Sequence, residues 1–404
     1  MRILILTLPL GHNYGGLLQA YALQAHLREQ GHEVETLDRR KPERIAPPTL
    51  KARIRKTLLY ALDRMKKIST RKKKAFMHKK LTEFRDRHIR MSERIDSEAK
   101  MRDYYLQHPM DAVVVGSDQV WRPFYSPSLT NFFLDFLDDT RSAGFPAARR
   151  ISYAASFGVD DWEFSQEQTD TCKALAQKFD AISVREQSAQ ALCREHLGVD
   201  AEWVVDPTLL LAAADYEKLM PTGTSQHKGK ILTYVLDPAE DKQAIAGEVA
   251  AVLKTDLFSV KPQKTPTEVT ASQLQQCQYP GVDEWLQGFR DASFVVTDSF
   301  HGCIFSIIFN RPFVAIGNAK RGLSRFHSLL KIFELEDRLV SAPEQVTPEL
   351  ITLAIDWNSV NRIRQMKAQE AQAFLVRNLH RPLAHEALKL GQQDPENGAD
   401  LFLR

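Results

Sequence analysis

Short apolar runs, each followed by a turn and then by a helical pattern, constrain the fold of this chain most strongly. Residues 2–8 form one such run, and a glycine-rich loop at 11–16 and a helical pattern at 17–30 follow it. A run without polar alternation is typical of a strand that is buried on both faces of a parallel sheet. Because this pattern recurs along the chain, we expect an α/β fold.

The expected strands fall into two groups. Those before residue 210 are expected at 2–8, 33–37, 111–115, 151–154 and 181–184. Those after it are expected at 230–236, 257–260, 293–297 and 312–316. We therefore expect two Rossmann-like domains facing a cleft, at 1–210 and 211–404. Helical patterns at 348–357 and 360–377 end the second domain and can pack back on the first.

The charge is distributed unevenly. The net charge is +3, but residues 39–80 hold 17 Lys and Arg against two acidic residues, so this block carries +15 and the remainder −12. Apolar residues recur every three or four positions between Leu50 and Ile68, which predicts an amphipathic helix in an insertion at about 40–100. One interpretation is a solvated helix that packs on the domain. The other is a helix that docks on an anionic surface, either membrane lipid or an acidic glycan. We do not expect nucleic acid as a partner, because the block contains only two aromatic residues and no recognisable binding motif.

Composition excludes several other classes of protein. Hydrophobic residues make up 43% and charged residues 26%, as in an average globular protein. No apolar run approaches the ~18 residues that cross a bilayer, and the N-terminus lacks the features of a secretory signal, so we expect a cytoplasmic protein. The four cysteines form no C-x-x-C pair, and we expect buried thiols and no metal site.

Two loops at expected strand ends are candidates for a binding cleft. The glycines of Asn13-Tyr14-Gly15-Gly16 allow backbone N–H groups to approach an anion at a helix start, although a tight turn explains them equally well. Asp118 and Gln119 follow the strand at 111–115 and can line a cleft, or Asp118 can simply cap a turn.

Titratable residues follow two other strands. Arg185 comes after the strand at 181–184 and can clamp a phosphate or carboxylate, or pair with Glu186. His301 lies between a strand and a helix, where an imidazole can act as acid or base or can serve as a structural hydrogen-bonding group. Three cations lie beyond the next strand and can serve the same edge or solvate the surface: Lys320, Arg321 and Arg325.

Six short segments of the chain together resemble the polysaccharide pyruvyl transferase family. In chain order they are NYGGLLQA (13–20), GSDQVW (116–121), YAASFG (153–158), SVRE (183–186), VDPTLL (205–210) and TDSFHG (297–302). The resemblance implies a fold of the glycosyltransferase-B type. It also implies transfer of pyruvate from phosphoenolpyruvate onto two hydroxyls of a sugar in a cell-surface polysaccharide or its precursor, forming a cyclic ketal.

The resemblance also implies roles for individual residues. His301 becomes the general acid/base and Arg185 a donor ligand. Ser299 stands where some family members carry an arginine, so a second donor cation has to come from Lys320, Arg321 or Arg325. The implied acceptor and cleft residues are Asn13, Tyr14, Gly15, Gly16, Asp118, Gln119 and Ser156.

Phosphoenolpyruvate is then a substrate, and no cofactor is expected. The acceptor is a glycan that can be lipid-linked, which fits a protein at the inner face of the membrane. Two other functions remain open: a glycosyltransferase-B-type enzyme that uses a nucleotide sugar, and a non-enzymatic peripheral membrane scaffold.

Overall fold

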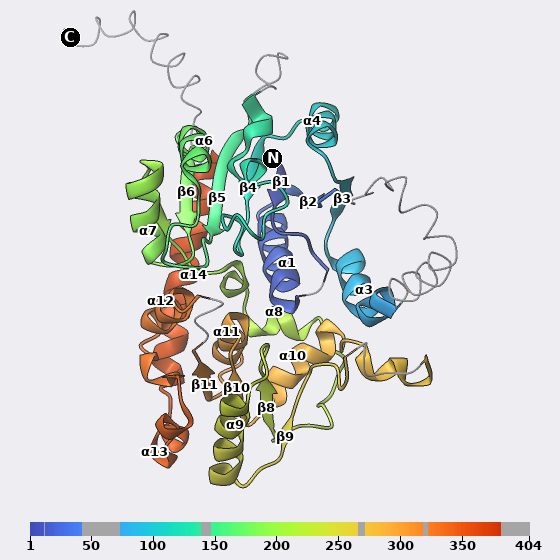
Figure 1. Cartoon of the computed structure of the whole chain (residues 1–404), viewed down its shortest axis with the longest axis vertical. Coiled ribbons are helices and arrows are strands. Elements are labelled where there is room, and N and C mark those ends of the chain that lie inside the picture. The colour runs from blue at the N-terminus through green and yellow to red at the C-terminus, as the bar shows by residue number, and fades with distance from the viewer. Residues whose placement is uncertain (12, 43–72, 139–146, 266–270, 318–321, 381–404) are drawn as a thin grey trace, which may run out of the picture.

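The computed structural model describes residues 1–11, 13–42, 73–138, 147–265, 271–317 and 322–380. Two parallel sheets lie one above the other in Figure 1, each flanked by helices, and the chain is an α/β protein with two domains. The two-domain α/β prediction is confirmed. The predicted basic helix at 50–68 falls within the range 43–72, outside the described residues.

The first sheet has seven parallel strands in the order β3-β2-β1-β4-β5-β6-β7. They are β1 (Arg2–Leu6), β2 (Glu33–Arg39), β3 (Met91–Ile95), β4 (Ala112–Val115), β5 (Arg149–Ala155), β6 (Ala181–Val184) and β7 (Glu202–Trp203). Ile3 on the central strand β1 pairs with Val34 on one side and with Ala112 on the other. All four residues of β4 are buried, which explains why its sequence is apolar throughout.

The second sheet has five parallel strands in the order β12-β11-β10-β8-β9. They are β8 (Ile231–Tyr234), β9 (Leu257–Phe258), β10 (Phe294–Thr297), β11 (Phe313–Ile316) and β12 (Leu339–Val340). The central strand β10 is buried along its whole length and carries the loop that leads to residue 301.

The helices connect these strands and cover the sheets. They are α1 (Tyr14–Glu29), α3 (Lys79–His88), α4 (Glu98–Gln107), α6 (Gln166–Ala176), α7 (Ser188–Leu192), α8 (Ala213–Glu217), α9 (Glu240–Leu253), α10 (Val282–Asp291), α11 (Phe300–Ile308), α12 (Ser324–Ile332), α13 (Pro348–Thr352) and α14 (Trp357–His380). In the described part of the chain, none of them combines the length and the apolar character needed to cross a lipid bilayer.

Three predicted helix boundaries are wrong. α1 starts at Tyr14 and not at residue 17, because the Asn13 side chain caps it by accepting a hydrogen bond from the Gly15 N–H. α11 starts at Phe300 and not at residue 303, because Ser299 caps it in the same way. The predicted helix at 348–357 ends at Thr352, because Asp356 accepts backbone hydrogen bonds at the start of α14.

An apolar core runs from one sheet to the other. The ring of Tyr14 on α1 stacks on Trp285 of α10, with centroids 5.3 Å apart. The Tyr14 hydroxyl donates a hydrogen bond of 2.8 Å to the Pro280 carbonyl. Both rings belong to one buried cluster that contains residues of β1 and of β8. The two halves of the molecule therefore share a hydrophobic interface.

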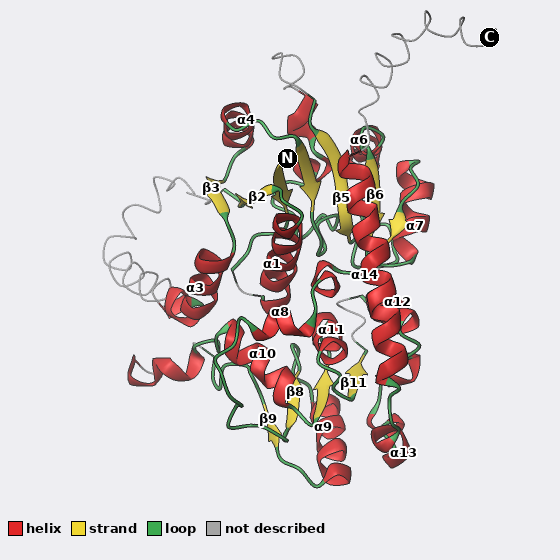
Figure 2. Cartoon of the chain, turned by 180° about the vertical axis from the view of Figure 1, so that it is seen from behind, coloured by secondary structure: helices red, strands yellow, loops and turns green. Residues whose placement is uncertain are grey.

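The last helix returns to the first sheet. α14 lies against β5, which the view from behind in Figure 2 shows. Its Phe374 ring lies 6.4 Å from the ring of Tyr153, and its Arg377 pairs with Glu202 at 2.6 Å. The domain limit at residue 210 stays a prediction, but α14 contacts residues on the N-terminal side of it.

The four cysteines are buried and free, as the sequence predicts: Cys172, Cys193, Cys277 and Cys303.

Candidate functional site

A cavity of about 360 Å³ lies where the strands β1, β4, β8 and β10 end. The carboxyl ends of parallel strands are where open α/β sheets bind their ligands. The residues that line it are Leu8, Pro9, Asn13, Asp118, Gln119, Tyr125, Leu236, Asp298, Ser299, Phe300, His301, Arg325 and Phe326. Both halves of the molecule therefore contribute to one site.

The turn between β10 and α11 places His301 in this cavity. The hydroxyl of Thr297 accepts a hydrogen bond from the Ser299 N–H and donates one of 2.7 Å to the Tyr234 carbonyl. Only a glycine fits at position 302, because a Cβ there would lie 2.2 Å from the Thr297 hydroxyl oxygen. The turn is therefore tight, and the imidazole belongs to the first turn of α11.

The imidazole of His301 lies between α1 and a buried carboxylate. Its Nε2 atom is 3.6 Å from Oδ2 of Asp206, and its side chain is 8% exposed. On the other side, a Cβ built on Gly15 would come within 2.1 Å of Nδ1. Only a glycine at position 15 leaves space for the imidazole.

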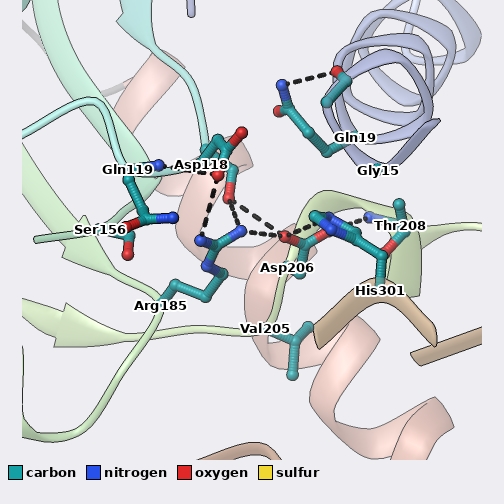
Figure 3. Close-up of polar contacts among 12 residues, drawn as sticks. Gly15, Gln19, Asp118, Gln119, Ser156, Arg185, Val205, Asp206, Thr208 and His301 are labelled. Carbon is teal, nitrogen blue, oxygen red and sulfur yellow. Dashed lines mark hydrogen bonds and ion pairs between the residues drawn. The ribbon is translucent and has the colours of Figure 1, made fainter. Parts of the chain in front are cut away.

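Asp206 is the centre of the polar network in Figure 3. Its Oδ1 accepts hydrogen bonds from the backbone N–H and the hydroxyl of Thr208. Its Oδ2 accepts one of 2.8 Å from Nη1 of Arg185 and one of 3.2 Å from the Ser117 hydroxyl. Burial alone would raise the pKa of Asp206, but His301 and Arg185 hold it well below its usual range. The carboxylate is therefore charged and faces the imidazole.

Arg185 follows β6 and points toward Asp206 and not into the cavity. Its side chain is 1% exposed, and its Nη2 atom lies 3.6 Å from Oδ1 of Asp118. Burial alone would lower the pKa of this guanidinium, but Asp206 and Asp118 raise it. Its Nε and Nη2 atoms make no hydrogen bond to any residue in the described ranges. Direct contact of Arg185 with the donor stays a prediction.

Arg325, on α12, does line the cavity. Burial, and then the nearby charge of Arg185, lower the pKa of Arg325 to about 10. The guanidiniums of Arg185 and Arg325 lie 4.6 Å and 5.6 Å from the ring centre of Phe300. Two buried cations that act on each other favour a site for an anionic ligand, because an anion relieves their repulsion.

The N-termini of two helices meet at the same cavity. Asn13 caps α1, Ser299 caps α11, and both line the cavity. The positive end of each helix dipole favours negative charge there. Asp118 has a φ of 76°, and its carboxylate accepts a hydrogen bond of 2.9 Å from the Gln119 N–H.

Besides Arg185, four predicted site residues of the described ranges do not line the cavity: Tyr14, Gly15, Gly16 and Ser156. Tyr14 is part of the core between the halves, and Gly16 follows on α1. The Ser156 hydroxyl donates a hydrogen bond of 2.9 Å to Oε1 of Glu186, which also accepts from two backbone N–H groups of the same loop. Lys320 and Arg321 lie outside the described residues.

Three residues that we did not predict support the site. They are Asp206, Phe300 and Asp298, which accepts hydrogen bonds from the backbone at 236 and 237 and from Lys242. The Asp206-Pro207-Thr208 sequence is a recognisable cap, but it does not reveal what the second carboxylate oxygen faces. Within the described part of the chain, no group of three or more His, Cys, Asp and Glu side chains is arranged to hold a metal ion.

The polysaccharide pyruvyl transferase family matches residues 13–320 of the chain, which is most of its length. The chain belongs to this family. It is therefore a transferase of polysaccharide biosynthesis, and a polysaccharide acceptor follows from membership. A search of curated proteins found no match.

Solved structures with a similar fold support the glycosyltransferase-B prediction. A Listeria monocytogenes protein described as UDP-N-acetylglucosamine 2-epimerase has a TM-score of 0.54 at 11% identity, over 94% of this chain and 97% of that one. The Neisseria meningitidis UDP-GlcNAc 2-epimerase bound to UDP-GlcNAc has a TM-score of 0.53 at 8% identity, over 94% and 99%. Arabidopsis thaliana UGT89C1, complexed with UDP-L-rhamnose, has a TM-score of 0.51 at 9% identity, over 94% and 98%. At these identities the likeness shows the fold alone.

The family match includes the network around Asp206 but ends before Arg325. It starts at Asn13, the cap of α1, and extends beyond His301. In this pyruvyl transferase family member, Arg325 lines the cavity but lies outside the matched range.

Proposed function

We propose that this protein transfers pyruvate from phosphoenolpyruvate onto two hydroxyls of one sugar and forms a cyclic ketal. The observation that carries the proposal is that one cavity contains both the His301 imidazole and the buried Arg325 guanidinium. The reaction needs both, since it moves protons and binds a donor that carries a phosphate and a carboxylate.

The donor side is formed by Arg325 and the two helix N-termini. A planar guanidinium can bind phosphate or carboxylate through two parallel hydrogen bonds, and backbone N–H groups at a helix start favour the second anion. Lys320 and Arg321 remain candidates for further contacts, as the sequence indicates. Ser299 offers a hydroxyl at the same place and no charge.

The atoms balance as follows. One sugar hydroxyl adds to the central carbon of the enol, and its proton is transferred to the methylene carbon, which becomes a methyl group. The second hydroxyl then adds to the same carbon, and the bond between this carbon and the phosphate oxygen breaks. The second proton leaves with the phosphate, and no oxidant, metal or cofactor enters this sequence.

His301 moves these protons, and Asp206 positions it. Nε2 faces Asp206, and Nδ1 lies beside Gly15, where the absence of a side chain leaves this nitrogen room to contact the substrate. The carboxylate stabilises the imidazolium that forms when the ring takes a proton, as the buried aspartate does in a Ser-His-Asp triad. Arg185 fixes Asp206 through its hydrogen bond of 2.8 Å and acts as a positioning residue.

The test is phosphate release from phosphoenolpyruvate in the presence of candidate glycans, together with mass spectrometry of the glycan for the added ketal. His301→Ala should lower turnover by about 10²–10⁴-fold. His327→Gln is the matched control, because His327 is exposed on α12. Unchanged turnover in a folded His301→Ala variant would contradict this role.

A nucleotide sugar is the alternative donor. The structures with a similar fold that were solved with UDP-GlcNAc or UDP-L-rhamnose motivate it. Nucleotide release from UDP-sugars, without phosphate release from phosphoenolpyruvate, would replace the first proposal by this one.

The location that fits this function is the cytoplasmic side of the membrane. Phosphoenolpyruvate is a cytoplasmic metabolite, and the acceptor in this proposal is a lipid-linked precursor. The +15 block at 39–80 would hold the enzyme on the anionic bilayer that carries the acceptor.

A further inference from the structure

Two neighbouring aromatic side chains lie exposed beside the cavity. Phe124 is 80% exposed and Tyr125 is 37% exposed, and their rings form a T-shaped pair with centroids 5.7 Å apart. The other large hydrophobic residues that are exposed in the described ranges are single positions elsewhere: Leu257, Leu353, Met366 and Val376. Single exposed residues are normal, whereas an exposed aromatic pair at a cavity indicates a contact surface.

The turn that carries this pair is held in place by several hydrogen bonds. Arg122 binds the carboxylate of Glu163 through two nitrogens, at 2.9 Å and 2.8 Å. The backbone N–H groups of Tyr125 and Ser126 both donate to the Arg122 carbonyl. The Arg122 guanidinium lies 5.1 Å from the ring centre of Tyr125. The rings are therefore presented by a fixed turn and do not need to be ordered when a ligand binds.

The pair continues the site already described. Tyr125 lines the cavity together with His301 and Arg325. Phe124 follows outward from Tyr125, and its carbonyl accepts a hydrogen bond of 3.4 Å from Lys41, near the start of the basic block. A ligand that extends out of the cavity over Tyr125 therefore meets Phe124 next, with Lys41 beside it.

We infer that Phe124 and Tyr125 form the acceptor platform, on which a sugar ring of the glycan stacks while its two hydroxyls reach His301. This inference rests on the proposed function, because it assigns the acceptor end of the same cavity. One face of a pyranose ring carries mainly C–H groups, and an aromatic face is the apolar surface that covers it. The ring hydroxyls remain free at the edges for hydrogen bonds and for reaction.

The first experiment measures acceptor and donor separately. Phe124→Ala should raise the acceptor KM about 10-fold, which corresponds to about 1.4 kcal/mol, because it removes the apolar surface that covers one face of the sugar. The affinity for phosphoenolpyruvate and the midpoint of unfolding should not change. Phe124→Trp should keep the parental acceptor KM, and Met366→Ala, which removes an exposed apolar side chain from α14, is the matched control.

The second experiment does not depend on the reaction. Saturation-transfer NMR with methyl glucoside, methyl galactoside and methyl mannoside should show binding to the parent protein through the C–H face of the sugar, and this signal should disappear in Phe124→Ala. No transfer to any of these glycosides, or equal transfer in both proteins, would overturn the platform. The parent protein could release no phosphate from phosphoenolpyruvate and still show saturation transfer that Phe124→Ala loses. In that case the donor proposal fails and the platform stands.

Discussion

His301 and Gly15 occupy complementary space: the imidazole lies where any side chain at position 15 would have to be. A Cβ at Gly15 would come within 2.1 Å of Nδ1 and 2.4 Å of Cγ of His301. Gly15 belongs to α1 and His301 to α11, so the contact joins the two halves of the molecule at the cavity. The position of the imidazole therefore depends on the glycine of the other half.

Gly15→Ala should lower kcat strongly, because the methyl group displaces the imidazole from the cavity. A misplacement of about 1 Å can cost about 10²-fold in rate. Gly16→Ala is the matched control, since the nearest atom to a Cβ there is Cβ of Asn13 at an ordinary 3.7 Å. Steady-state kinetics of both variants decides the point, and equal activities would show that the contact does not position His301.

Asp206→Asn should destabilise the fold by about 3–5 kcal/mol, because it leaves the buried guanidinium of Arg185 without its charged partner. The pKa of Asp206 lies below its usual range, so its contribution is fully present above the unfolded pKa of about 3.9 and is lost as the pH falls through the folded value. Urea unfolding of parent and variant should differ by a constant amount near neutral pH. The difference should shrink below about pH 4, and a pH-independent difference would contradict this account.

Arg325→Gln should weaken phosphoenolpyruvate binding about 10–100-fold, since a hydrogen bond to a charged group is worth about 1.5–3 kcal/mol. It should cost less stability than Asp206→Asn, because it also removes the repulsion between two buried guanidiniums. Calorimetric titration with phosphoenolpyruvate is the measurement. Lys331→Gln, an exposed change on the same helix, should retain the parental affinity.

The same titration tells whether Arg185 contacts the donor or acts only by positioning Asp206. If it contacts the donor, Arg185→Ala should weaken binding more than Arg185→Lys, without full rescue by the ammonium. If it acts only through Asp206, both variants should keep the donor affinity and should lose kcat and stability instead.

The basic block should bind anionic vesicles in a salt-dependent manner. Each Lys or Arg near such a surface is worth about 1 kcal/mol, screened over about 8 Å at physiological salt. Changing Lys66, Lys67, Lys72, Lys73 and Lys74 to Gln should abolish binding and leave activity on a short soluble acceptor intact. Vesicle binding that is absent or insensitive to salt in the parent protein would contradict membrane recruitment.

Sequence patterns predicted the central strands of the sheets better than the edge strand β3. The central strands β1, β4 and β10 are apolar apart from Arg2 and Thr297, because both of their faces are buried. The edge strand β3 has the sequence MSERI, of which only Ile95 is buried, so it offers no such run. The bounds of α3 and α4 were not predicted for the same reason, because only two residues of α3 and three of α4 are buried.

The sequence predicted which loops form the candidate site, but it did not predict the hydrogen bonds and ion pairs between them. Residue order placed His301, Ser299 and Asp118 after strands, and the ends of β4 and β10 face one cavity from the two different sheets, so all three residues line it. The sequence does not tell which of two buried cations faces the ligand. Arg185 donates a hydrogen bond of 2.8 Å to Asp206, which comes from a distant segment, whereas Arg325 lines the cavity.

The stacking of Tyr14 on Trp285 has a mechanical consequence for how substrates enter and leave. The apolar seam starts one residue after Asn13, at the edge of the cavity, and Phe374 of α14 packs on β5 behind it. Prising the halves apart would expose these rings to water, at about 25 cal/mol for each Å² of apolar surface. Burial of these rings therefore opposes any separation of the two halves that would widen the cavity.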